Sequence, residues 1–214
     1  MNELIYYRPI EKRDYESLEK LIIHTWGYEK FCSPKTARRM ARLYLTSCLM
    51  EQTFTCVAVR NGEAIGIIMC NDTSQSRRTR IKYAWRMLLP TLAMACTKEG
   101  RRISKMFSNF YQIDKDLLKQ SGEKYDGTLA FFALRNDQRG TGIGKALWMR
   151  GLDYMRKQRI SRFYLYTDTT CNYGFYEHHG MKRICEQTVS LKPYYDNAMN
   201  FFLYSYSFVK VDIK

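Results

Sequence analysis

The sequence lacks any group of cysteines and histidines at the spacing of a metal site. Its seven cysteines are scattered and include no CxxC pair: Cys32, Cys48, Cys56, Cys70, Cys96, Cys171 and Cys185. Zinc ligands recur at short, regular intervals, so we expect no metal. An odd number of dispersed cysteines, several of them inside apolar runs, is typical of free thiols in a reducing compartment.

Long apolar runs and a leader sequence are also missing. The longest apolar segment, residues 84–96, is too short to span a bilayer and contains Arg86. The first residues show no basic region followed by an apolar one, as a signal peptide does. We therefore expect a cytoplasmic protein with no membrane among its partners.

Acidic residues are scarce relative to basic ones. Lys and Arg number 35 against 21 Asp and Glu, a formal net charge of +14. Such a surplus attracts polyanions and phosphorylated cofactors. It is concentrated in residues 77–105, where Glu99 is the sole acid among nine cations: Arg77, Arg78, Arg80, Lys82, Arg86, Lys98, Arg101, Arg102 and Lys105.

Strand and helix patterns alternate along the chain, which is 45% hydrophobic and 14% aromatic. Apolar periodicity predicts strands at 4–8, 53–59, 64–69, 129–134, 163–167, 182–191 and 201–209, and helices at 14–26, 36–50, 84–96, 103–118, 140–159 and 171–179. Asn61-Gly62 predicts a type I′ hairpin turn. Pro90 predicts a kink and Gly100 a helix end. The expected architecture is one mixed α/β domain over residues 1–214, with a helical insertion at about 72–126.

The most informative segment runs from the 129–134 strand through a polar turn and three alternating glycines into a helix. A helix N-terminus presents unpaired N–H groups and the positive end of a dipole, and glycine lets the backbone approach a phosphate closely. Arg139 and Lys145 add positive charge at the same place. Gln138 to Ala146 therefore predict a phosphate cradle.

Two other phosphate loops fit this segment less well. A dinucleotide fingerprint needs Gly or Ala where Lys145 or Leu147 stands, although an acid, Asp168, does follow the next strand. A P-loop needs Gly at position 139 and Ser or Thr at position 146, and the sequence has neither. Close packing of a helix on a strand is the purely structural alternative for the three glycines.

Arg139-x-x-Gly142-x-Gly144 resembles the pyrophosphate signature Q/R-x-x-G-x-G/A of the GNAT superfamily of N-acetyltransferases. A second stretch, Asn172 to Met181, resembles the superfamily's C-terminal motif of an Asn, an aromatic-Tyr pair, a Gly and an apolar residue. The resemblance covers the chain apart from the insertion. It implies a mostly antiparallel central sheet flanked by helices, with the insertion between strands 3 and 4.

The resemblance also implies transfer of an acetyl group from acetyl-CoA to a primary amine that attacks directly while both substrates are bound. Backbone N–H groups near the end of the 129–134 strand would polarise the carbonyl, and Tyr176 would protonate the leaving thiolate. Asn172 and Tyr176 would share one helix face. A packed core aromatic is the alternative for Tyr176. The implied acetyl-CoA-binding residues are Phe132, Ala133, Leu134, Arg139, Gly140, Thr141, Gly142, Ile143, Gly144, Lys145, Asn172 and Tyr176.

The general base is less well marked, because no acid stands within 129–134. Glu123 and Asp126 come just before this strand and are the candidates, acting directly or through water, or only solvating a turn. The positive charge of the insertion predicts a small-molecule or peptide amine that carries an anionic group. The aromatic final strands are compatible with a homodimer seam or an internal sheet.

The alternative function is a GNAT-shaped binding protein. In this interpretation residues 77–105 hold RNA, the ribosome or an acidic protein, with Tyr83, Trp85 and Phe107 available for stacking. The opposing interpretation places these aromatics in the core and the charges in water, and it leaves nucleic acid out of the expected partners.

Overall fold

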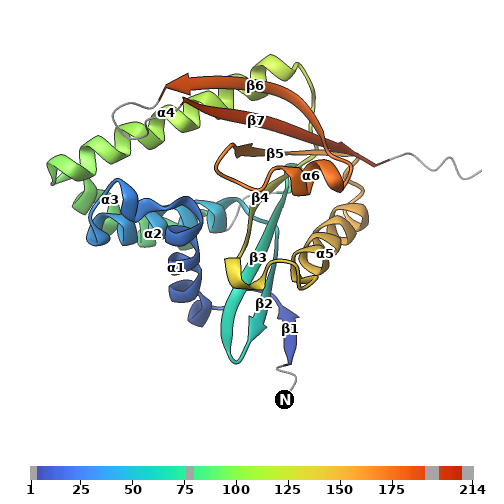
Figure 1. Cartoon of the computed structure of the whole chain (residues 1–214), viewed down its shortest axis with the longest axis horizontal. Coiled ribbons are helices and arrows are strands. Elements are labelled where there is room, and N and C mark those ends of the chain that lie inside the picture. The colour runs from blue at the N-terminus through green and yellow to red at the C-terminus, as the bar shows by residue number, and fades with distance from the viewer. Residues whose placement is uncertain (1–3, 76–79, 191–197, 209–214) are drawn as a thin grey trace, which may run out of the picture.

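The computed structural model describes residues 4–75, 80–190 and 198–208. Seven strands form one sheet in the order β1-β2-β3-β4-β5-β7-β6 (Figure 1). All neighbouring strands are antiparallel except β4 and β5. The predicted mixed, mostly antiparallel sheet is confirmed. The strands are β1 (Ile5–Arg8), β2 (Phe54–Arg60), β3 (Glu63–Asp72), β4 (Gly127–Leu134), β5 (Arg162–Asp168), β6 (Lys182–Ser190) and β7 (Ala198–Ser207).

Helices cover both faces of this sheet. Figure 1 shows α1 to α4 on one side and α5 on the other. Helix α5 connects the two parallel strands, which need a crossover of this kind. The pair α3 and α4 follows β3 and precedes β4, so the predicted helical insertion is confirmed. The helices are α1 (Tyr15–Trp26), α2 (Pro34–Glu51), α3 (Arg80–Ala95), α4 (Lys98–Ser121), α5 (Ile143–Lys157) and α6 (Gly174–His178).

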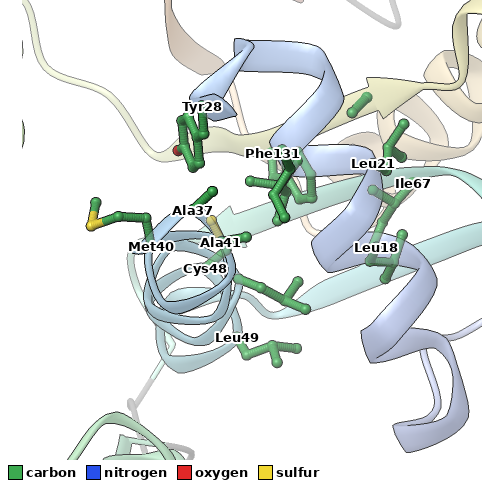
Figure 2. Close-up of a cluster of buried hydrophobic side chains, with 14 of the residues drawn as sticks. Leu18, Leu21, Tyr28, Ala37, Met40, Ala41, Cys48, Leu49, Ile67 and Phe131 are labelled. Carbon is green, nitrogen blue, oxygen red and sulfur yellow. The ribbon is translucent and has the colours of Figure 1, made fainter. Parts of the chain in front are cut away.

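The largest core cluster lies between the sheet and helices α1 and α2. Figure 2 shows side chains of both helices meeting Ile67 of β3 and Phe131 of β4. Leu18 and Ile22 of α1 are fully buried there, and each such side chain contributes roughly 1.5–3 kcal/mol. Along β4, Phe131 points to this cluster, whereas Phe132 packs against the cluster on the α5 side. The alternation of a β-strand thus gives the two faces of β4 different neighbours.

The hairpin turn follows the sequence prediction, but the helix end does not. Asn61 and Gly62 join β2 to β3 with φ of 52° and 79°, as a type I′ turn requires. Gly100, by contrast, lies in the first turn of α4. Its N–H donates to the N-cap Thr97 at 3.0 Å. A Cβ at Gly100 would lie 2.2 Å from the Met94 carbonyl oxygen, so glycine is needed for the close approach of α4 to α3 rather than for a helix stop.

Helix α4 crosses the face of the sheet that α1 and α2 also cover, and it thereby links two hydrophobic clusters. Its first half buries Ile103 and Met106 in the α1/α2 cluster. Its second half buries Ile113 and Leu117 against β7. The second half of α4 therefore lies over β5 and β7, and it brings its polar residues close to these strands. Arg77 and Arg78 of the basic stretch lie outside the described residues, as do the predicted ends of the last two strands at 191 and 209.

Candidate functional site

The two parallel strands β4 and β5 pair along only part of their length. Gly127 pairs with Phe163 and Thr128 with Tyr164, and no further β4–β5 pair occurs in the described residues. On their other sides, β4 stays paired with β3 as far as Leu134 and β5 with β7 as far as Asp168. Beyond Thr128, the facing backbone edges are thus left without strand partners. Backbone N–H and C=O groups at such an edge are available to an extended, amide-bearing ligand.

The glycine turn stands directly after this open edge of β4. Gly140 and Gly142 have φ of 77° and 84°, and a Cβ at either position would meet nothing within 4 Å. Helix α5 begins at Ile143, so the first N–H groups of α5 have no helical acceptor. Arg139 and Lys145 are exposed, and neither forms an ion pair within the described residues. The turn combines open backbone, a helix N-terminus and two free cations, which suits a pyrophosphate.

Side-chain hydrogen bonds fix the conformation of the glycine turn. Buried Gln138 accepts a hydrogen bond from the Arg60 guanidinium at 2.7 Å. The Thr141 hydroxyl donates to the Gln138 carbonyl at 2.6 Å, so this predicted ligand-binding side chain takes part in the turn itself. Arg135 is neutralised by Asp137 at 2.7 Å and by Glu63 at 3.1 Å. Arg139 therefore differs from Arg135 in having its charge available.

Tyr176 lies on α6, among aromatic side chains beside β4. Its ring centroid is 6.4 Å from that of Phe132 and 6.2 Å from that of Trp148. Burial raises the pKa of the Tyr176 phenol, and the neighbouring Cys171 and Asp168 raise it further. Its hydroxyl has no hydrogen-bond partner among the described residues. The phenol therefore stays protonated at neutral pH, which is the form that donates a proton.

Asn172 is not on the helix that carries Tyr176. The helix begins at Gly174, later than predicted, because two tight turns precede it. The Cys171 N–H donates to the Asp168 carbonyl at 3.1 Å, and the Tyr173 N–H donates to the Cys171 carbonyl at 3.0 Å. Asn172 is therefore exposed in the β5–α6 loop and does not share a helix face with Tyr176.

Helix α4 brings Asp114, which the sequence analysis missed, to the end of β5. Tyr164 and Tyr166 of β5 pack on the cluster that holds the second half of α4. Burial, with the charge of Asp168, raises the pKa of the Asp114 carboxyl to about 7. No hydrogen bond or ion pair reaches this carboxyl from the described parts of the chain. An acid beside the apolar positions 113 and 117 is the only signal in the sequence, and it does not say which strand α4 covers.

The two predicted bases lie at the opposite end of β5. Asp126 accepts hydrogen bonds from the Ser161 hydroxyl and from the N–H of Arg162, and the Ser161 bond lowers its pKa. Glu123 forms an ion pair with Arg162. Arg162 opens β5, whereas Asp168, which adjoins Tyr176, closes it. The seven residues of β5 separate these ends by about 20 Å.

Comparisons with known proteins agree with this geometry. Residues 94–181 match the model of the acetyltransferase (GNAT) family. The resemblance to the GNAT family is thus confirmed over residues 94–181. No curated protein matches its sequence.

Three solved structures share the GNAT fold at low sequence identity. PH1933 from Pyrococcus horikoshii is 16% identical, with a TM-score of 0.59 over 96% of this chain and 99% of that one. The PaiA N-acetyltransferase of Thermoplasma acidophilum, solved in complex with coenzyme A, is 14% identical, with a TM-score of 0.53 over 96% and 99%. The ribosomal-protein-S18-alanine N-acetyltransferase of Escherichia coli is 12% identical, with a TM-score of 0.54 over 99% of both.

The cysteine beside Tyr176 is not activated. Burial raises the pKa of the Cys171 thiol to about 11, with Asp168 adding to the shift. Its sulfur lies 3.9 Å from an Asp168 carboxylate oxygen. A thiol in this state is neutral at pH 7 and a poor nucleophile. Within the described residues, no group of three or more His, Cys, Asp and Glu side chains is arranged to hold a metal. Nor does any helix in those ranges have the length and apolar character needed to span a bilayer.

Proposed function

We propose that this GNAT domain transfers an acetyl group from acetyl-CoA to a primary amine while both substrates are bound. The observation that carries the proposal is the continuity of the glycine turn with the unpaired edge of β4. One ligand can place a pyrophosphate at the start of α5 and run an amide-bearing arm between β4 and β5. Acetyl-CoA has both parts, and it supplies a thioester whose thiolate leaves.

The chain offers a group for each demand of this reaction. Arg139, Lys145 and the first N–H groups of α5 hold the pyrophosphate. Backbone N–H groups near Phe132 to Leu134 polarise the acyl carbonyl. Tyr176 gives its proton to the departing sulfur, and its raised pKa supports this role because the phenol is protonated beforehand. The neutral Cys171 thiol supports direct attack by the amine over an acyl-enzyme.

Asp114 is our choice of general base. An alkylammonium has a pKa of about 10.4 and must lose a proton before it attacks. Asp114 lies on the face of the sheet that α1 to α4 cover, opposite the face that α5 covers (Figure 1), and close to Asp168. A base that titrates near neutral pH combines ionisation with proton affinity. The low pKa of Asp126 and its bonds to Ser161 favour a structural role there.

The charges at the site bear on the acceptor. The prediction that the acceptor carries an anionic group depended on the positive charge of residues 77–105. The last cation of this stretch, Lys105, precedes Asp114 by nine residues, about 14 Å along α4. Asp114 and Asp168 lie next to the open edge, and their ionised carboxylates favour a cationic amine. The name of the Escherichia coli neighbour, an acetyltransferase of a ribosomal-protein alanine, supports a peptide N-terminus or a small amine as acceptor.

Thermal unfolding with acetyl-CoA, NAD⁺, ATP or a short RNA tests the proposal. A ligand at a hundred times its Kd stabilises by about 2.7 kcal/mol, which shifts the midpoint of a domain of this size by roughly 5–10 °C. We expect this shift with acetyl-CoA only. Stabilisation by NAD⁺ or RNA with no effect of acetyl-CoA would contradict the proposal. An amine panel with and without anionic groups, read by release of the CoA thiol, then identifies the acceptor class.

A further inference from the structure

One helix of the insertion turns an apolar face to solvent. Trp85, Leu88, Leu89 and Leu92 of α3 are 78%, 47%, 75% and 53% exposed. Their spacing of three, four and seven residues places them along one face of the helix. Contiguous exposed apolar side chains of this kind are rare on a protein that has no partner for them. We call these four residues the α3 stripe.

The α3 stripe is additional to the face that packs α3 onto the protein. Met94 is buried and Tyr83 packs against the α1/α2 cluster. Arg86 points inward as well, with its guanidinium 2.5 Å from Glu19 and 3.1 Å from the Thr46 hydroxyl. The core interactions of α3 are thus made by other residues. Much of the surface of the stripe is therefore left to solvent.

A cationic groove of about 770 Å³ lies between α2 and α3 and is lined by Leu89 of the stripe. Leu89, Pro90 and Ala93 of α3 form one wall. Four cations at helical spacing line the α2 wall: Lys35, Arg38, Arg39 and Arg42. No acidic residue lines the groove. Lys35 and Arg38 form no ion pair within the described residues, whereas Arg42 pairs with Glu19 at 3.4 Å.

We propose that α3 and this groove dock the protein on an anionic phospholipid membrane surface. An interfacial helix places Trp and Leu at the boundary of headgroups and acyl chains, with cations beside the phosphates. In the groove the cations lie next to Leu89, so the charged headgroup of a lipid can meet the cations while its apolar part meets the leucine. The lack of a spanning segment predicted no membrane partner, but the sequence alone does not reveal that Trp85 and three leucines are exposed.

Two other occupants fit these observations less well. A single-stranded nucleic acid binds through several stacked aromatics, but of the three candidates only Trp85 is exposed. Tyr83 and Phe107 pack against the core, and leucine offers no stacking surface. For a protein partner, Trp85 is of a residue type that is enriched among binding hot spots, but the other three stripe residues are leucine, which is under-represented there. Lys35 and Arg38, which have no ion pair within the described residues, lie beside Leu89 and are complementary in charge to an anionic lipid surface.

Co-sedimentation with vesicles tests the proposal. The full chain is mixed with phosphatidylcholine vesicles, or with vesicles in which phosphatidylglycerol replaces a third of the lipid. We expect binding to the anionic vesicles only, weakened by salt. Brominated acyl chains should quench Trp85, and the quenching should be absent in Trp85→Phe. A wild-type protein that binds neither vesicle overturns the proposal.

Paired variants separate the two halves of the surface. Trp85→Ser with Leu89→Ser should lower partitioning at least about tenfold. Lys35→Gln with Arg38→Gln should lower it roughly 20- to 30-fold, because each cation near an anionic surface contributes a factor of about five. Both pairs are exposed, so the unfolding midpoint should be retained. Tyr111→Ser, an exposed aromatic on α4, is the matched control and should leave partitioning unchanged.

Three other results would also overturn the proposal. One is full binding by both double variants. Another is a concentration-dependent dimer without vesicle binding that Leu89→Ser returns to a monomer, because the stripe is then an interface between copies. The third is a midpoint shift with RNA that only Lys35→Gln with Arg38→Gln abolishes, because the groove then holds nucleic acid.

Discussion

The carboxyl of Asp114 on α4 lies close enough to that of Asp168, at the end of β5, to feel its charge. Burial and this repulsion together raise the Asp114 pKa to about 7. Helix α4 also brings Tyr111 toward the same group, with the Lys115 ammonium 4.4 Å from the Tyr111 ring, and β5 adds Tyr164 and Tyr166. An insertion helix thus places a titratable group beside the open edge of the sheet. Perturbed carboxyls of this kind concentrate at functional sites.

Asp114→Asn is expected to remove the base. In the wild type, kcat/KM should rise with an inflection near pH 7 as Asp114 ionises. The variant should lose that inflection and roughly 10²-fold or more of the rate at pH 8. Asp116→Asn is the matched control, because Asp116 is exposed on the same helix and bonds only to Gln112, at 2.9 Å. An unchanged profile in Asp114→Asn would return the role of base to Asp126 or Glu123.

The same substitution, Asp114→Asn, should raise the stability of the protein at pH 8 although it lowers activity. The folded-state pKa of Asp114 is raised above its ordinary value near 3.9, so the folded protein holds this proton more tightly than the unfolded chain. Stability from this group is present below about pH 4 and is lost as pH rises through about 7. Asp114→Asn should therefore raise the unfolding midpoint at pH 8 and leave it nearly unchanged at pH 4, with about 2–4 °C for each kcal/mol. A lower midpoint at pH 8 would show that Asp114 is stabilising instead.

Tyr176→Phe tests the proton donor. We expect kcat to fall roughly 10²- to 10⁴-fold with acetyl-CoA binding nearly intact, because the ring packing against Phe132 and Trp148 is retained. Tyr173→Phe is the control, since its ring packs against Phe202 at 5.3 Å on the same segment. Equal rates in the two variants would make Tyr176 a packing residue.

Arg139→Gln tests the pyrophosphate site against a neighbouring arginine. A charge-assisted hydrogen bond contributes about 1.5–3 kcal/mol, so the Kd for acetyl-CoA should rise roughly 10- to 100-fold. Arg135→Gln should leave Kd nearly unchanged, because Asp137 and Glu63 already neutralise Arg135. Calorimetric titration measures both values. The same loss in both variants would mean that overall charge, not the turn, attracts the ligand.

Gly142→Ala and Gly144→Ala test whether a glycine in the turn is needed for its positive φ or for the space that a side chain would fill. An L-residue at the positive φ of Gly142 costs about 1–2 kcal/mol, which should lower the unfolding midpoint by roughly 2–8 °C and weaken acetyl-CoA binding. A Cβ at Gly144 would meet Leu134 at 3.7 Å, an ordinary contact, and alanine favours helix there. Gly144→Ala should therefore keep its midpoint and its affinity. Identical behaviour of the two variants would contradict this division.

The features that the sequence alone determined are local. The element order, the Asn61-Gly62 hairpin and the glycine turn depend on periodicity, on positive φ and on unpaired helix N–H groups, all of which involve residues close together in the chain. The Gly100 stop was wrong because glycine has two uses, and only packing against Met94 shows which one applies.

The tertiary structure decided which distant groups meet. Asp114 and Asp168 come together because α4 buries Ile113 and Leu117 over β7, a packing choice that no local pattern records. Asp126 precedes β4 in the chain, yet the parallel pairing of β4 with β5 places it beside Ser161, at the opposite end of β5 from Tyr176. The exposure of the α3 stripe also could not be predicted, because the sequence of a helix with apolar residues on two faces does not show which face is buried in the core.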